Sequence, residues 1–411
     1  MSFCNYRKSA LRRIFNIAAA HQRPNASQQS NRCGSPEGAR RSEMMKKDAA
    51  AQVNDKGERF ERRRGSAYEE VRMQLKKGIN LGGFLSQCSH EQSHYDTFFD
   101  ASDMQQIRQW GFDHVRLPFD YNVVQDEDGA PIEAGYARLA ALVAMASENQ
   151  MNIILDLHKV GGYDFNFAGD LSKNNLFADE TLIERFLSIW TEIAQRFGTE
   201  PHVAFELLNE VVETENADGW NALIERAITE IRAIAPLTPI IYGGIKWNSA
   251  DTLKLLNPPI SGGIIYTFHF YEPLLFTHQK AFWVPEIKDV EPISYPDSMA
   301  AYKAKSEVLG IKGDAVMTTQ VETMGKPFID DMIRGALAAA EAAGVPLYCG
   351  EFGVIDQAPV EDTVRWFADV IDVLKSHQIG HAVWTYKEKD FGIIDPHYAS
   401  VRDEIISILT E

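Results

Sequence analysis

The sequence of 411 residues predicts an α/β protein built around a (β/α)₈ barrel, the fold known as a TIM barrel. Two observations predict this fold. From residue 78 onward, eight short apolar segments alternate with longer helical patterns, and this alternation is typical of a parallel sheet closed into a barrel. Polar and aromatic residues also gather at the ends of the apolar segments, where barrels of this kind carry their active sites.

The expected strands are short apolar segments that end in polar residues: Gly78–Leu81, His114–Pro118, Asn152–His158, Val203–Asn209, Pro239–Gly243, Gly263–His269, Pro346–Glu351 and Gly380–Trp384. The expected helices lie near residues 102–111, 135–149, 180–197, 217–235, 249–256, 328–343, 361–377 and 398–410. The pattern is clearest in the third helix, where an apolar stripe recurs at helical spacing: Leu182, Phe186, Ile189, Trp190, Ile193 and Phe197.

One connection is too long to be a simple loop. The segment from Glu272 to about Met324 follows the sixth strand and is rich in aromatic residues and proline. Unstructured connections of this length are uncommon inside a compact domain. We therefore expect an insertion at about residues 272–326, on the barrel face that carries the active site.

Charge divides the chain into two parts. The whole sequence has a net charge of −17, but residues 1–72 carry 16 basic and 8 acidic side chains, a net of +8, which leaves −25 for residues 73–411. Only 8 of the first 72 residues are Ile, Leu, Val or Phe, too few to drive folding, so we expect a disordered basic extension there. Its apolar patch at residues 14–20 is too short to favour a secretory signal peptide.

Several classes of protein are disfavoured. The acidic total argues against a nucleic-acid partner, which would require a basic face. No run of 18 apolar residues predicts a membrane span. The four cysteines lack the spacing of a metal site or a disulfide framework, and unpaired cysteines fit a cytoplasmic location. We expect a monomer without cofactor or metal.

Two glutamates end expected strands that face each other across the barrel. Glu210 ends the fourth strand, and Glu351 lies between two glycines at the end of the seventh. Glycoside hydrolysis requires such a pair, with one carboxyl protonated and the other ionised. A separation of about 5–5.5 Å would retain the anomeric configuration, and about 6.5–9.5 Å would invert it. Taken alone, either glutamate also fits a structural ion pair.

A resemblance to a known family rests on several segments spread over residues 76–411: Lys77–Gln87, His114–Asp120, Leu155–His158, Phe205–Val212, Phe268–Pro273, Phe276–Gln279, Leu347–Val354 and Ala382–Lys387. In these segments the sequence resembles glycoside hydrolase family 5, also called cellulase family A, and most closely its clostridial endoglucanase C type. The resemblance implies that Glu210 is the acid/base and Glu351 the nucleophile. It also implies a β-1,4-linked glucan as substrate. The eight residues that this family keeps around its catalytic centre all have matches: Arg116, His158, Asn209, Glu210, His269, Tyr271, Glu351 and Trp384.

The chemistry of three of these side chains suits the implied roles independently. Arg116 can hold Glu351 ionised, because a neighbouring positive charge lowers the pKa of a carboxyl group. Tyr271 can donate a hydrogen bond to the same carboxylate. Asn209 is placed to bind the sugar 2-hydroxyl, a contact that strengthens in the transition state.

The remaining three residues suit substrate binding. His158 and His269 could orient hydroxyl groups or tune the acid, although a single histidine at a strand end is more often structural. Trp384 offers a flat surface for a pyranose ring; its alternative role is ordinary core packing.

Two departures from the family pattern concern the substrate subsites. Phe84 stands where related sequences usually have tryptophan, and Lys159 stands where many have a second histidine. The aromatic loop at residues 161–167, together with Trp247 and Trp283, supplies further candidate surfaces for sugar stacking.

We therefore expect a retaining endo-β-1,4-glucanase that acts on cellulosic or mixed-linkage glucan polysaccharides or oligosaccharides. The alternatives within the family are a β-mannanase and a β-1,3-glucanase. Outside it, a non-catalytic carbohydrate-binding barrel and a metal-dependent barrel hydrolase remain. The second of these is disfavoured because the histidines show no metal-ligand spacing.

Overall fold

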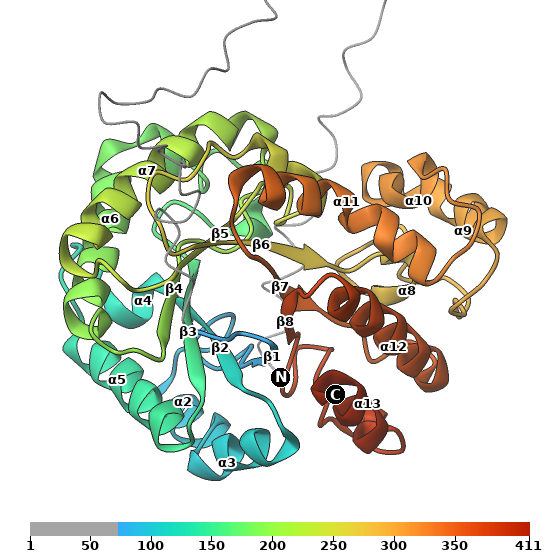
Figure 1. The fold of residues 1–411 in the computed structure, drawn as a ribbon, viewed down its shortest axis with the longest axis horizontal. Helices are drawn as coiled ribbons and strands as arrows, with labels where there is room; N and C mark the ends of the chain where they lie inside the picture. The colour runs from blue at the N-terminus through green and yellow to red at the C-terminus, as the bar shows by residue number, and fades with distance from the viewer. Residues whose placement is uncertain (1–72) are drawn as a thin grey trace, which may run out of the picture. The chain divides into compact units, whose positions relative to one another are not determined.

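Eight parallel strands close into a barrel in the order of the sequence (Figure 1). This computed structural model describes residues 73–411, so the expected disordered extension at residues 1–72 lies outside the described residues. The barrel confirms the predicted fold class, and each strand lies within a few residues of its predicted position. The strands are β1 Lys77–Asn80, β2 His114–Asp120, β3 Asn152–Lys159, β4 Val203–Glu206, β5 Ile240–Gly243, β6 Ile264–Phe270, β7 Leu347–Phe352 and β8 Gly380–Val383.

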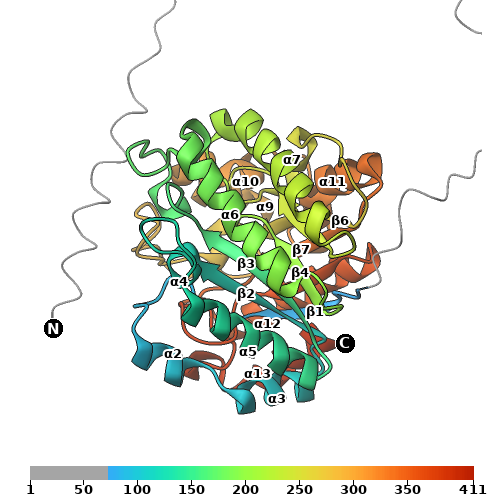
Figure 2. The same cartoon turned by 90° about the vertical axis from the view of Figure 1, so that its left-hand side faces the viewer.

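Helices cover the outside of the barrel, and Figure 2 shows three of them, α5, α6 and α7, lying over the strands. The longer helices are α3 Ala101–Trp110, α5 Glu133–Glu148, α6 Glu180–Phe197, α7 Ala217–Ile234, α11 Lys326–Ala343, α12 Val360–Ser376 and α13 Arg402–Thr410. Short helices lie in the connections: α2 Gln92–Phe98, α4 Tyr121–Val124, α8 Leu274–Thr277, α9 Met299–Ser306 and α10 Asp314–Thr318. Between β5 and β6 the connection forms only a 3₁₀ helix, η4 Ala250–Leu255, where a helical stretch at 249–256 was expected.

Helix α6 illustrates how an amphipathic helix packs against the barrel and supports the backbone that leads to Glu210. Its N-terminus is capped by the Asp179 side chain, which accepts a hydrogen bond from the Thr181 backbone. Its apolar stripe is buried against the barrel, and the Trp190 indole donates a hydrogen bond of 3.1 Å to the Leu207 carbonyl. This bond holds the helix against the backbone that leads from β4 to Glu210.

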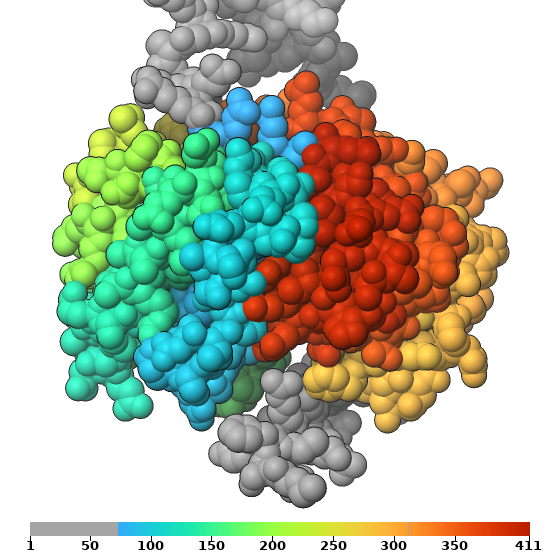
Figure 3. Space-filling model, turned by 90° about the horizontal axis from the view of Figure 1, so that it is seen from below, coloured from blue at the N-terminus to red at the C-terminus, as the bar shows by residue number. Residues whose placement is uncertain are grey.

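The barrel closes where the first strand pairs with the last. Strand β1 pairs with both β2 and β8, and Figure 3 shows the blue to cyan segment beside the red C-terminal segment on one face. The Lys77 ammonium donates to the Thr410 carbonyl in the last helix. The Tyr386 hydroxyl donates a bond of 2.6 Å to Asp103 in α3. These hydrogen bonds join residues about 300 positions apart where the barrel closes.

The segment between β6 and α11 carries helices α8, α9 and α10 and lies at the edge of the barrel in Figure 1. It is tied to α12 through Tyr295, whose backbone N–H donates to Asp362 at 3.0 Å and whose hydroxyl donates to Asp369 at 2.9 Å. Among residues 73–411, no helix is both long enough and apolar enough to cross a membrane.

Candidate active site

The eight predicted site residues come together at the C-terminal mouth of the barrel. Four lie within strands: Arg116 in β2, His158 in β3, His269 in β6 and Glu351 in β7. The other four follow strand ends: Asn209 and Glu210 after β4, Tyr271 after β6 and Trp384 after β8.

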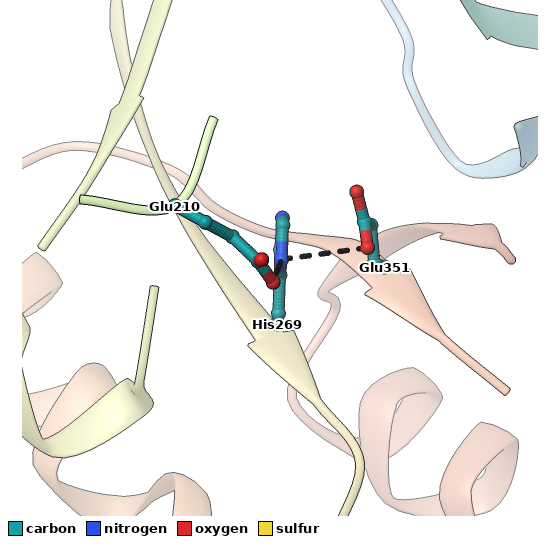
Figure 4. Close-up of side chains that lie close together, drawn as sticks. All are labelled: Glu210, His269 and Glu351. Atoms are coloured by element: carbon teal, nitrogen blue, oxygen red, sulfur yellow. Dashed lines mark hydrogen bonds and ion pairs between the residues drawn. The ribbon is translucent and has the colours of Figure 1, made fainter. Parts of the chain in front are cut away.

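Glu210 and Glu351 face each other with His269 between them (Figure 4). The His269 Nδ1 atom lies 2.8 Å from Oε1 of Glu210 and 3.6 Å from Oε2 of Glu351. One oxygen from each carboxyl group and this nitrogen all lie within 4.8 Å of one another. The register between β6 and β7 pairs His269 directly with Glu351, after a bulge at Phe268. This spacing fits the short separation of a retaining pair better than the wider separation of an inverting pair.

Arg116 forms the centre of a buried polar network beneath these carboxyl groups. Its guanidinium is fully buried and donates to both oxygens of Glu206, at 2.7 and 3.0 Å, and to Oε1 of Glu351 at 2.7 Å. It also lies 3.1 Å from Asp156 and donates to the side-chain oxygens of Asn80 and Asn209. A single positive charge is thus shared among three buried carboxyl groups.

The surroundings of the two catalytic candidates differ. Burial raises the pKa of both carboxyl groups, but Glu351 also accepts hydrogen bonds from Arg116 and, at 3.0 Å, from the Tyr271 hydroxyl. These donors favour the ionised form of Glu351. Among residues 73–411, Glu210 has His269 as its hydrogen-bond partner and no such donor from Arg116 or a tyrosine. Burial raises the pKa of each carboxyl to about 7, with Arg116 opposing the shift in both, so the contrast rests on the hydrogen bonds. The geometry therefore suits an ionised Glu351 and a protonated Glu210.

Asn209 presents an unused donor. Its side-chain oxygen accepts from Arg116 at 2.9 Å, which turns its amide nitrogen away from the network. That nitrogen is buried and has no hydrogen-bond partner among residues 73–411. Since a buried donor without a partner is costly, the position suits a donor that completes its bonding on a substrate hydroxyl.

His158 and Trp384 pack against each other. Their rings are stacked at 5.7 Å between centroids with an angle of 5°. The His158 Nδ1 atom lies 2.7 Å from Asp156, and its Nε2 atom lies 3.4 Å from the amide nitrogen of Gln87. Trp384 is only 6% exposed, so much of the indole packs against protein, and His158 covers part of it.

The other candidates for sugar contact divide into buried and exposed side chains. Phe84 is 3% exposed and stacks on Phe98 in the core, so its ring offers little surface for a sugar. In the loop at residues 161–167, Tyr163 is buried and donates to Glu213 at 2.8 Å. Trp247 is 43% exposed, and Trp283 is partly buried against His278 and Phe391.

Sequence reasoning missed the two acids that accompany Arg116. Asp156 and Glu206 pair across β3 and β4, and both side chains are fully buried. A signal was available, because each is a charged residue inside an otherwise apolar strand, and such residues are rarely buried without a partner. Burial raises the pKa of Asp156 to about 7, although Arg116 opposes the shift.

Glu210, His269 and Glu351 are also residue types that bind metal ions. In this arrangement each already has partners: Glu210 bonds to His269, and Glu351 accepts from Arg116 and Tyr271. Arg116 supplies the positive charge that the carboxylates require, so we assign no metal to the site.

Comparisons with known proteins agree with this geometry. The model of the cellulase family, glycosyl hydrolase family 5, matches residues 76–390. Cellodextrinase A from Ruminococcus flavefaciens is 38% identical over 304 residues, which cover 74% of this chain and 83% of that protein. Endoglucanase C from Acetivibrio thermocellus is 36% identical over 342 residues, which cover 82% of this chain and 98% of that protein.

A solved structure shares the fold. Cel5A from Thermotoga maritima in complex with cellobiose matches 82% of this chain and 97% of its own length, with a TM-score of 0.62 and 23% identity. The family match covers most of the described residues, and two relatives exceed one third identity over most of their length. The chain therefore belongs to glycosyl hydrolase family 5.

Proposed function

We propose that this protein is a retaining endo-β-1,4-glucanase. The observation that carries the reaction type is the spacing of Glu210 and Glu351, whose nearest oxygens lie within 4.8 Å of each other. Carboxyl groups this close suit attack by one carboxylate on the anomeric carbon, because they leave too little room for the water that inversion requires.

The proposed reaction has two steps. Glu210 donates its proton to the glycosidic oxygen while the Glu351 carboxylate attacks the anomeric carbon, and a covalent glycosyl–enzyme forms as the leaving sugar departs. Glu210, now ionised, then removes a proton from water, which attacks the anomeric carbon and releases Glu351. Once Glu351 is glycosylated its negative charge is gone, so the pKa of Glu210 falls and suits a base.

The binding residues complete the mechanism. The unused Asn209 amide donates to the sugar 2-hydroxyl, and Tyr271 holds the Glu351 carboxylate in place. His158, Trp384 and the exposed Trp247 are the candidates for contact with sugar rings and hydroxyl groups. All of these residues lie in one chain, so the proposal requires no second subunit.

The assignment of the substrate is based on the proteins to which this chain is similar. Proteins named endoglucanase and cellodextrinase share 36–38% identity with this chain over most of its described length. We therefore propose cellulosic or mixed-linkage β-glucan and its soluble oligosaccharides as substrates, and residues 73–411 as the catalytic domain.

The test is the release of reducing sugar from barley β-glucan and carboxymethylcellulose, run in parallel with mannan, xylan and laminarin. We expect release from the first two, and proton NMR of early products should show the β-anomer first. Faster release from mannan or laminarin would reassign the substrate. No release from any glycan, with binding intact, would instead indicate a carbohydrate-binding barrel.

A further inference from the structure

Three consecutive residues after β5 adopt a left-handed backbone. Lys246, Trp247 and Asn248 have φ angles of 51°, 58° and 52°, and residues other than glycine rarely adopt such positive values. Two consecutive side chains in this segment differ in their exposure to solvent: Trp247 is 43% exposed, whereas Asn248 is 1% exposed. Strained backbone of this kind persists where the surrounding structure requires it, often at functional sites.

The buried Asn248 side chain contacts His269 on the face opposite the glutamates. Its Nδ2 atom lies 3.3 Å from His269 Nε2, and the backbone carbonyl of Asn248 accepts a hydrogen bond of 2.9 Å from the backbone N–H of His269. The amide nitrogen of asparagine can only donate. His269 Nε2 must therefore accept, so in a neutral imidazole the single proton lies on Nδ1.

This proton points at Glu210. His269 Nδ1 lies 2.8 Å from Glu210 Oε1, and burial lowers the pKa of His269 to about 4, which keeps the ring neutral at neutral pH. With Nδ1–H donating to Oε1, that oxygen acts as an acceptor, and the acid proton of Glu210 resides on Oε2. In the other tautomer, Nδ1 would accept the proton of Glu210 and withhold it from the substrate.

We propose that Asn248 is a positioning residue that holds His269 in its Nδ1–H tautomer and thereby leaves the acid proton of Glu210 on the oxygen free to reach the leaving group. This inference rests on the proposed glycosidase function and deepens it. The His269 ring also experiences the other charged and titratable groups of the site, on β2, β3, β4 and β7: Arg116, His158, Glu206 and Glu351.

The Asn248→Asp variant tests the tautomer directly. Aspartate has nearly the same shape and tolerates left-handed backbone, but its carboxylate accepts a hydrogen bond from Nε2–H and favours the opposite tautomer. We expect kcat on cello-oligosaccharides to fall about 10- to 100-fold, a partial loss of general acid catalysis. Hydrolysis of 2,4-dinitrophenyl cellobioside should stay within about twofold of wild type in its glycosylation step, because that leaving group requires little protonation.

Ser249→Ala is the matched control, since its side chain donates to Asp251 and not to His269. We expect it to match wild type on both substrates. Equal losses on both substrates in Asn248→Asp, or no loss on either, would overturn the proposal.

A second measurement does not depend on activity. Nitrogen-15 NMR of histidine-labelled protein distinguishes the two neutral tautomers, and a His269→Gln variant identifies the His269 signals. We expect wild type to show Nδ1 protonated and Nε2 unprotonated, with a shift toward Nε2 protonation in Asn248→Asp. A wild-type ring protonated on Nε2 would refute the inference even in an active enzyme. The expected tautomer in a protein that cleaves no glycan would refute only the proposed function.

Discussion

The Nη1 atom of Arg116 lies 2.7 Å from Oε1 of Glu351, and neither side chain is more than 6% exposed. The same guanidinium makes a two-pronged contact with Glu206. The buried Arg116 guanidinium thus binds both the proposed nucleophile, Glu351, and a second carboxylate, Glu206, which does not contact the substrate in the proposed mechanism. Removing the cation would leave both carboxylates buried and unpaired, which is far more costly than losing an exposed ion pair.

Replacing Arg116 with lysine should therefore destabilise the protein. Lysine carries the charge but cannot reproduce the planar set of donors. Because the charge remains and only hydrogen bonds to charged groups are lost, we expect a loss of about 1.5–3 kcal/mol in the free energy of unfolding, measured by urea denaturation. Arg226→Lys is the control, because Arg226 pairs with Glu180 and Glu184 at the surface, and its loss should be less than about 1 kcal/mol. Similar losses in both variants would contradict the shared-cation interpretation.

Replacing Glu351 with glutamine should abolish turnover and preserve glucan binding. The amide keeps the size of the side chain but cannot attack the anomeric carbon, so we expect kcat to fall by more than about 10³-fold. Binding of cellotetraose, measured by calorimetry, should remain detectable. Glu361→Gln, at an exposed position in α12, serves as the control. Near-normal turnover in Glu351→Gln would rule out its assignment as nucleophile.

The pH dependence of kcat/KM should be bell-shaped. Glu210 must be protonated to act as an acid, and its pKa of about 7 in the buried site means that activity falls as the pH rises through this value. On the acid side, activity falls as Glu351 becomes protonated. For wild type assayed with 2,4-dinitrophenyl cellobioside, this alkaline limb should be absent from the glycosylation step, because that leaving group requires little protonation. An unchanged alkaline limb would assign it to another group.

The raised pKa of Glu210 also predicts a pH-dependent cost in stability. The folded protein holds this proton up to about pH 7, whereas the unfolded chain releases it near 4.5, so stability falls as the pH rises between these values. Glu210→Gln carries no such penalty. We expect it to be more stable than wild type by about 1–3 kcal/mol at pH 8 and nearly equal at pH 4, measured by urea unfolding. An equal difference at both pH values would contradict this explanation.

Chelation should leave activity unchanged. Glu210, His269 and Glu351 have partners within the site, and the proposed reaction uses no Lewis acid. We expect the same rate on barley β-glucan before and after exhaustive dialysis against EDTA. A loss that a divalent cation restores would favour a metal-dependent hydrolase.

The sequence by itself determined the barrel and the residues at its mouth. Strand and helix periodicities depend on neighbours two to four positions away, so they can be identified without tertiary structure. In a parallel barrel, strand ends converge on one face, and this rule brought Arg116, Glu210 and Glu351 into one predicted site. The stretch predicted as helical at 249–256 is a 3₁₀ helix at Ala250–Leu255, because so short a pattern does not distinguish a 3₁₀ helix from an α-helix.

Only the tertiary structure decided which side chains of the site are in contact with one another. The spacing of Glu210 and Glu351, the pairing of Arg116 with Glu206, and the contact of Asn248 with His269 depend on the closure of the barrel and the register of its strands. Phe84 lies in the core beside Phe98 of α2, a contact that its position in a motif did not reveal. Differences of a few tenths of an ångström in the distances between residues far apart in sequence set the hydrogen bonds and pKa values, and no local pattern encodes them.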